Sequence, residues 1–273
     1  MTATTQTVTV PDGAVLHLEI HGTPSLAQPS LLFLHYYGGS PSTYALTLRQ
    51  SKLDGMHSIL YHARGWAPST GPDDPAAYSI RAMSGDLAQI VRETGADAHG
   101  AGFILVGHSM GAKVAQHYAA TAQPSRLKGL LLLAPAPLRG LRFPDEVKAQ
   151  QRAGYEGPAS VEYVLDHVLT AGPGALPAQA RRQCIVDSLR GNDHARAAWP
   201  GYGAEEECGV ECKDIEVPVL VLRGDRDFER EVVGELGVKE GWRNEVLEGC
   251  GHLVPLERPD VVARELKRFV DTL

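Results

Sequence analysis

The chain has 273 residues, of which 43% are hydrophobic and 22% are charged, a composition typical of a folded globular protein and not of a disordered one. Its 26 basic and 33 acidic residues give a formal net charge of −7, which provides no electrostatic basis for binding nucleic acid or an anionic membrane surface. A chain of this length can form one α/β domain that carries an insertion.

The first ten residues contain no basic residue and no apolar run, so they do not resemble a secretory signal. The longest apolar stretch, residues 129–138, is too short to cross a bilayer and contains two prolines. We therefore expect no membrane span, a cytoplasmic location and cysteines that remain free thiols. The cysteines have no zinc-binding spacing, so no metal is expected. They are Cys184, Cys208, Cys212 and Cys250.

Short apolar runs rich in branched residues predict strands, and four of them are apolar almost throughout, as is typical of strands buried on both faces. The predicted strands are Val15–Ile20, Leu31–His35, Ser58–His62, Phe103–Val106, Leu130–Leu133, Val219–Leu222 and Glu245–Leu247. The turn signal Val10-Pro-Asp-Gly13 lies between two strand-like runs. It predicts an antiparallel hairpin over 7–20 at one edge of the sheet.

Amphipathic segments between these strands predict helices. They are Thr43–Leu53, Ile80–Glu93, Met110–Ala122 and Pro259–Leu273. The third stops before Pro124, as a helix should. Alternation of strands and helices predicts right-handed crossovers and a mostly parallel central sheet with helices on both faces, the α/β class.

The region from 137 to 217 contains no strong strand pattern. It has helix-like pieces, separated by clusters of glycine and proline, at Pro144–Ala153, Val161–Leu169 and Pro177–Arg190. We interpret 137–217 as a helical cap inserted into a core of residues 1–136 and 218–273. Its aromatic residues could line a pocket or pack the cap itself. They include Tyr155, Tyr163, Trp199 and Tyr202.

The pentapeptide Gly107-His108-Ser109-Met110-Gly111 lies between a predicted strand and a predicted helix. This is the context of a nucleophile elbow, a sharp turn that holds a serine in a strained backbone conformation. The two glycines leave room for neighbouring backbone, and the positive end of the new helix favours a developing oxyanion. Ser109 is therefore the predicted nucleophile, and His108 is expected to support the site.

A serine nucleophile needs a base and a carboxylate that orients the base. The strand at 219–222 runs into Gly224-Asp225-Arg226-Asp227. A carboxylate there lies at the same sheet edge as the elbow, where ligand chemistry gathers in open α/β sheets. Position alone leaves Asp225 and Asp227 as competitors. Further along, His252 lies between the last predicted strand and the last predicted helix.

Together these motifs resemble the α/β-hydrolase family, esterases and lipases among them, and the resemblance covers almost the whole chain. In that family the acid stands three residues after the glycine that ends this strand, which implies Asp227 as the orienting acid and Asp225 as a turn residue. The sequence Gly249-Cys250-Gly251-His252 is similar to the histidine loop of the family. The resemblance therefore implies His252 as the base.

The segment Leu31–Ser40 is a predicted strand that runs into a glycine-rich loop. The family has His-Gly-x here, and the backbone N–H of x is an oxyanion donor. The resemblance implies an oxyanion hole formed by the N–H groups of Tyr37 and Met110. Tyr36 departs from the pattern, since glycine is usual at its position. We expect Gly38-Gly39 to supply the backbone freedom that is lost there.

These parts predict a serine hydrolase that cleaves an ester, thioester or lactone bond of a small organic substrate through an acyl-enzyme. No metal or organic cofactor is implied. Serine at the elbow excludes dehalogenases and epoxide hydrolases of this fold, which use aspartate there. A C–C bond hydrolase, an acyltransferase, a hydroxynitrile lyase and a non-catalytic ligand receptor are the alternatives. The sequence contains no indication of an oligomeric state.

Overall fold

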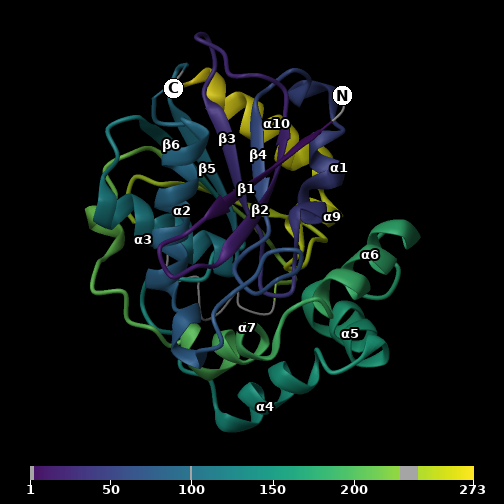
Figure 1. Ribbon diagram of the computed structural model, residues 1–273. Coiled ribbons are helices and arrows are strands. Elements are labelled where there is room, and N and C mark those ends of the chain that lie inside the picture. Colours follow the sequence, from purple (N-terminus) through teal and green to yellow (C-terminus); the bar gives the residue numbers. More distant parts are fainter. Residues whose placement is uncertain (1–2, 99, 228–238) are drawn as a thin grey trace.

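The computed structural model describes residues 3–98, 100–227 and 239–273. Within these ranges eight strands form one sheet in the order β1-β2-β4-β3-β5-β6-β7-β8 (Figure 1). The strands are β1 (Thr4–Thr9), β2 (Val15–His21), β3 (Ser30–Leu34), β4 (Ser58–Tyr61), β5 (Phe103–His108), β6 (Leu127–Leu133), β7 (Val219–Gly224) and β8 (Arg243–Leu247).

Pairing in the sheet is antiparallel at one edge and parallel elsewhere. Strand β2 pairs antiparallel with both β1 and β4, and the pairs from β4 through β8 are parallel. The edge hairpin and the mostly parallel sheet are therefore confirmed. Every residue of β3, β5 and β7 is buried, as expected for strands covered on both faces.

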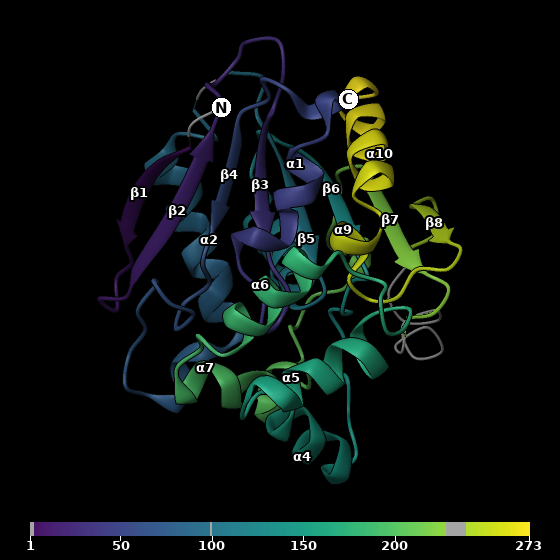
Figure 2. The same cartoon turned by 90° about the vertical axis from the view of Figure 1, so that its right-hand side faces the viewer.

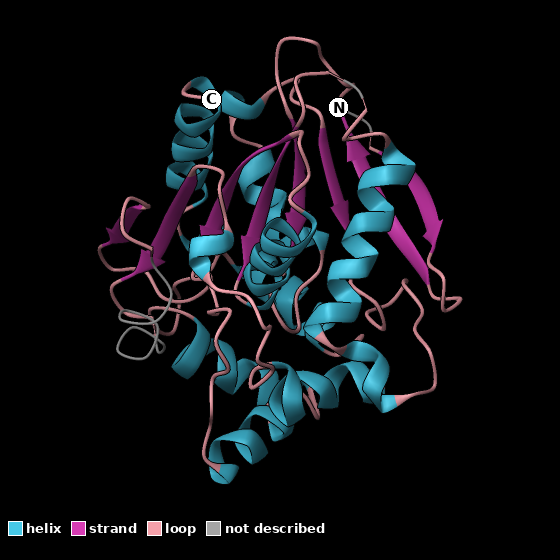
Figure 3. Cartoon of the chain, turned by 90° about the vertical axis from the view of Figure 1, so that its left-hand side faces the viewer, coloured by secondary structure: helices cyan, strands magenta, loops and turns pink. Residues whose placement is uncertain are grey.

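Different helices cover the two faces of the sheet. Along β5, Phe103 and Leu105 join the core that contains residues of α2 and α3, whereas Ile104 and Val106 join the core that contains residues of α10. Figure 2 views the sheet from the side of α1, α9 and α10, and Figure 3 views it from the opposite side. These helices are α1 (Ala45–Leu48), α2 (Ile80–Thr94), α3 (Met110–Ala122), α9 (Val254–Glu257) and α10 (Pro259–Asp271).

The predicted helix Thr43–Leu53 is wrong as a single element. The chain there forms a 3-10 turn at Pro41–Tyr44, the short α1, and a second 3-10 turn at Ser51–Leu53. Gln50 takes extended backbone angles of φ −73° and ψ 129°, which break the helix. Tertiary contacts fix this segment instead, since the Tyr44 hydroxyl donates to the Leu34 carbonyl at 2.7 Å.

Between β6 and β7 the chain forms a set of short helices beyond the carboxyl ends of the parallel strands (Figure 3). They are α4 (Asp145–Ala153), α5 (Pro158–Val164), α6 (Ala178–Ser188) and α7 (Asp193–Ala198), with π-helical turns at Leu165–Leu169 and Trp199–Gly203 and a 3-10 turn at Cys212–Asp214. This placement brings them over the sheet edge where β5 and β7 end. Among the described residues, no helix is both long and apolar enough to cross a membrane.

Candidate active site

Ser109 lies at the junction of β5 and α3 in a strained backbone conformation, with φ 54° and ψ −113°. A positive φ at a residue other than glycine costs about 1–3 kcal/mol and persists only where surrounding contacts impose it. Those contacts are backbone hydrogen bonds, in which the Ser109 N–H donates to Leu133 at 3.0 Å and the Ser109 carbonyl accepts from Ala112 and Lys113. The side chain of Ser109 lines a cavity and is otherwise buried.

The two glycines of the pentapeptide are required by close packing. A Cβ on Gly107 would lie 2.6 Å from the Cα of Ala112, and one on Gly111 would lie 2.5 Å from the carbonyl oxygen of Leu34. Both obstacles are backbone atoms, so neither can move aside easily. Any side chain at these positions would push α3 away from the strands that hold Ser109.

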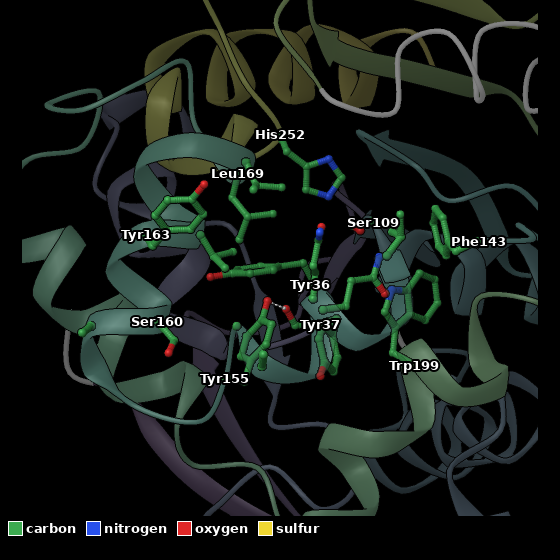
Figure 4. A pocket seen from close by; sticks show the side chains of 18 residues that line it. Tyr36, Tyr37, Ser109, Phe143, Tyr155, Ser160, Tyr163, Leu169, Trp199 and His252 are labelled. Atoms are coloured by element: carbon green, nitrogen blue, oxygen red, sulfur yellow. Dashed lines mark hydrogen bonds between the residues drawn. The ribbon is translucent and has the colours of Figure 1, made fainter. Parts of the chain in front are cut away.

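His252 and Asp227 come together from two separate loops. Asp227 follows β7 and His252 precedes α9, and the Nδ1 atom of His252 lies 2.9 Å from an Asp227 carboxylate oxygen. The two side chains are only 2% and 5% exposed. A buried carboxylate in this position holds the proton on Nδ1, which makes Nε2 the nitrogen that accepts another proton. Ser109 and His252 line the same cavity (Figure 4).

Asp225, the competing carboxylate, forms hydrogen bonds with the backbone of residues 247 and 250. Its N–H donates to the Leu247 carbonyl at 3.0 Å, and its carboxylate accepts from the Cys250 N–H at 3.2 Å. It therefore ties the end of β7 to the loop that carries His252. The imidazole contact is made by Asp227.

His108 contacts the backbone of the loop that carries His252. It is fully buried, and its Nε2 lies 2.7 Å from the carbonyl oxygen of His252. Burial, together with the nearby charge of a protonated His252, lowers the pKa of His108 to about 3. His108 is therefore neutral near pH 7, and its Nε2–H donates to that carbonyl.

His35 fixes the backbone at Tyr36 and Tyr37. Its Nε2 accepts from the Ala63 N–H at 3.0 Å, which places the ring proton on Nδ1, and Nδ1 lies 2.7 Å from the Tyr36 carbonyl. Burial lowers the pKa of His35 to about 4, so the ring is neutral. The Tyr36 carbonyl and the Tyr37 N–H belong to one planar trans peptide and point in opposite directions. The hydrogen bond from His35 fixes the direction of the Tyr36 carbonyl, and so the Tyr37 N–H points away from the His35 ring.

The next carbonyl groups of this loop are held by residues of the segment between β6 and β7. The Tyr155 hydroxyl donates to the Tyr37 carbonyl at 3.1 Å, and the Ser188 hydroxyl donates to the Gly38 carbonyl at 3.1 Å. Gly38 has a φ of 86°, and a Cβ there would also collide with the Tyr155 ring. Glycine is thus needed at 38 for both conformation and space.

Tyr36 is accommodated without a left-handed backbone, because its φ is not positive. Its ring lies with its centroid 5.1 Å from that of His108. A Cβ on Gly39 would lie 2.7 Å from the Tyr36 ring, so Gly39 provides the space that this ring occupies. Glycine is therefore required at 38 by a positive φ and by the Tyr155 ring, and at 39 by the Tyr36 ring.

Met110 is the first residue of α3, which has 13 residues. An N–H at the first position of a helix has no acceptor within the helix. The positive end of the helix dipole also lies there. This N–H can therefore donate to an oxygen atom bound beside Ser109.

A cavity of about 730 Å³ opens beside Ser109 and His252. It is lined by the Tyr36–Tyr37 loop and by residues of α4, α5 and the turn that follows (Figure 4). Tyr155, Tyr163 and Trp199 line it, as one of the two alternatives for the aromatic residues predicts. Tyr202 packs outside it, and its hydroxyl donates to the Pro75 carbonyl at 2.6 Å.

Several lining residues were not foreseen from the sequence, among them Phe143 and Leu169. Phe143 lies in an irregular segment before α4, so no periodic pattern reveals it, and Leu169 ends a π-helical turn whose contacts the helix-like pattern of 161–169 does not specify. Within the described part of the chain, no group of three or more His, Cys, Asp or Glu side chains could hold a metal ion. The four cysteines carry free thiols.

Comparison with known proteins identifies a family and several relatives of this chain. The family model described as the Alpha/beta hydrolase family matches residues 31–265. The chain is 28% identical over 265 residues to monoacylglycerol lipase abhd6-B of Xenopus laevis, covering 90% of this chain and 76% of that protein. It is 26% identical to a proline iminopeptidase of Lactobacillus delbrueckii subsp. lactis, covering 82% and 83% of the two chains.

Among solved structures, the esterase EaEST from Exiguobacterium antarcticum superimposes with a TM-score of 0.80. The match covers 97% of this chain and 99% of that one, at 20% sequence identity. At this level of identity the likeness concerns the fold. It agrees with the α/β architecture described above, which confirms the predicted fold class.

Proposed function

The chain belongs to the alpha/beta hydrolase family and is a hydrolase, and we propose that it cleaves an ester, thioester or lactone bond of a small organic substrate by serine catalysis. In this proposal residues 137–217 form the cap over the site. The observation that carries the proposal is the triad arrangement. Ser109 lies strained at the elbow, beside a cavity that it shares with His252, and His252 is hydrogen-bonded to Asp227.

In the first half of the reaction, Nε2 of His252 removes the proton from the Ser109 hydroxyl as the oxygen attacks the substrate carbonyl. The carbonyl oxygen becomes an oxyanion and accepts from the N–H groups of Tyr37 and Met110. When the tetrahedral intermediate collapses, the bond to the leaving group breaks. His252 returns its proton to that group, and the acyl group remains on Ser109.

In the second half, water replaces the leaving group. His252 takes a proton from the water as its oxygen attacks the acyl carbonyl, and it gives that proton to the departing Ser109 oxygen. The carboxylic acid product leaves and Ser109 is restored. The Asp227 carboxylate stabilises the imidazolium in both halves without itself becoming protonated. Serine at the elbow supports this acyl transfer over the epoxide opening that an aspartate would perform.

The proposal is tested by rapid mixing of the enzyme with p-nitrophenyl butyrate. We expect a burst of p-nitrophenol close to one equivalent per enzyme whenever deacylation is slower than acylation, followed by steady turnover. Neutral thioester and lactone substrates extend the test. If no substrate of the three classes is hydrolysed, the proposed reaction is wrong and hydrolysis of another bond, such as the C–C bond of the first alternative, is favoured.

Activity is expected to fall as the pH is lowered from neutral, because a protonated His252 cannot accept the Ser109 proton. Burial lowers the pKa of His108 to about 3 and that of His35 to about 4, so these two neighbours remain neutral above about pH 5 and add nothing to the loss. A plot of log kcat/KM against pH should have one acid limb of slope one. A flat profile from acid to neutral pH would count against His252 as the base.

Replacing Tyr155 with phenylalanine is expected to lower kcat roughly tenfold and to leave KM nearly unchanged. The ring that lines the cavity stays, while the hydrogen bond that holds the Tyr37 carbonyl is lost and the oxyanion donor next to it loosens. Tyr163→Phe is the matched control, since Tyr163 also lines the cavity and is 64% exposed. Equal losses in the two variants, or a loss in KM alone, would contradict this role of Tyr155.

A further inference from the structure

The cavity beside Ser109 is lined by neutral side chains. Among the described residues that form its wall, none is Asp, Glu, Lys or Arg. The one titratable base, His252, is already paired with Asp227. Aromatic rings and short aliphatic groups make up most of the remainder, with Gln150, Gln151 and Ser160 as the polar exceptions.

Two charged groups near the cavity, Arg196 and Asp187, have hydrogen-bond partners within the protein. Arg196 donates to the Tyr155 carbonyl at 3.3 Å and to the Asp193 carboxylate at 2.6 Å. The buried carboxylate of Asp187 accepts from the Ser40 hydroxyl at 2.8 Å and from the Ser42 hydroxyl at 2.5 Å. Among the described lining residues, a charged group on a substrate would therefore meet no counter-charge in the cavity wall.

Two of the lining tyrosines, Tyr36 and Tyr155, are buried. Burial raises the pKa of both Tyr36 and Tyr155 well above the usual value, so their hydroxyls stay neutral. Moving an ion into such surroundings without a partner costs several kcal/mol. An apolar group instead gains about 25 cal/mol for each Å² removed from water.

The apolar lining extends to both sides of the reacting residues. In Figure 4, Leu169 and Tyr163 lie on one side of Ser109 and His252, whereas Phe143 and Trp199 lie on the other. The volume of about 730 Å³ falls within the range for drug-sized ligands, which is about 300–1,000 Å³. Both the acyl group and the leaving group can therefore be buried in apolar surroundings.

We propose that this site takes uncharged esters with an apolar aliphatic or aromatic group on each side of the ester linkage, and that it rejects esters carrying a carboxylate or a quaternary ammonium group. This inference rests on the proposed function. It adds the chemical class of the substrate, which the triad alone does not specify.

The test compares three p-nitrophenyl esters of similar size. They are the neutral valerate, the hemiglutarate, which carries a carboxylate, and the 4-(trimethylammonio)butyrate, which carries a fixed positive charge. We expect kcat/KM for both charged esters to be at least about a hundredfold below that for the valerate. If kcat/KM for either charged ester lies less than about a hundredfold below that for the valerate, the inference is wrong and the proposed function remains intact. No turnover of any ester overturns the proposed function, and the inference with it.

A second measurement places the discrimination in the cavity. Gln151→Glu adds a carboxyl group to the lining with almost no change of shape. A bound cationic ester favours the ionised form of this group, so the variant should raise the ratio of cationic to neutral ester turnover at least about tenfold. Gln179→Glu is the control, since it makes the same change on the exposed surface of α6, outside the lining. If both variants shift the ratio equally, or neither does, the overall charge of the protein and not the cavity governs selection, and the inference fails.

Discussion

Replacing Asp227 with asparagine is expected to lower kcat by about 10⁴-fold, while KM and the folded structure change little. Asparagine has the shape of aspartate, but its neutral amide can donate to Nδ1 of His252 and so hold the ring in the wrong tautomer. It also cannot stabilise the imidazolium that forms during proton transfer. The effect is large because this pair is buried, with the carboxylate only 5% exposed. Steady-state kinetics and circular dichroism of the purified variant provide the measurement.

Asp225→Asn is the matched control for this prediction. Asparagine keeps an oxygen that can accept from the Cys250 N–H, the contact that the carboxylate of Asp225 makes at 3.2 Å. We expect activity within a few-fold of the unmodified enzyme, as for most changes that preserve local hydrogen bonds. If Asp225→Asn is as damaging as Asp227→Asn, the orienting role does not belong to Asp227 alone. If only Asp225→Asn is damaging, the two assignments must be exchanged.

Ser109→Ala is expected to remove the burst of p-nitrophenol and to lower kcat by as much as about 10⁶-fold. The variant lacks the attacking oxygen but keeps the backbone hydrogen bonds that hold the turn, including that from the Ser109 N–H to Leu133. The strained φ of 54° disfavours alanine as it does serine, so we expect little change in thermal unfolding.

Ser160→Ala serves as the control, because Ser160 is also a serine that lines the cavity. It should retain the burst and most of the steady-state rate. Activity of Ser109→Ala within tenfold of the unmodified enzyme would contradict nucleophilic catalysis by Ser109.

Much of the fold could be predicted from local pattern. Runs such as Phe103–Val106 and Val219–Leu222 are apolar throughout, and only strands covered on both faces bury such runs completely. The start of α3 was predictable for a different reason, since the elbow motif requires a helix directly after Ser109. The prediction of one helix over Thr43–Leu53 was wrong because tertiary contacts, here those of Tyr44, determine the conformation of a short segment more than its intrinsic helix propensity does.

The candidate site was partly predictable. The pentapeptide and its position between a strand and a helix identify Ser109 as the nucleophile. The choice of Asp227 over Asp225 requires the spacing known from the family. Only the three-dimensional arrangement reveals the hydrogen bond from Tyr155 to the Tyr37 carbonyl, because these residues are 118 positions apart. The aromatic residues of the segment between β6 and β7 are visible in the sequence, but a single sequence does not say what each of them contacts.

The role of Ser109 as an activated nucleophile is tested most directly by labelling the native enzyme with a fluorophosphonate and mapping the modified peptide. Cleavage by trypsin yields residues 93–113, in which Ser109 is the only serine. We predict one phosphonyl group per chain on Ser109, with no labelling after heat denaturation or in Ser109→Ala. Absence of labelling, or a label on a residue other than Ser109, would contradict this account of the site.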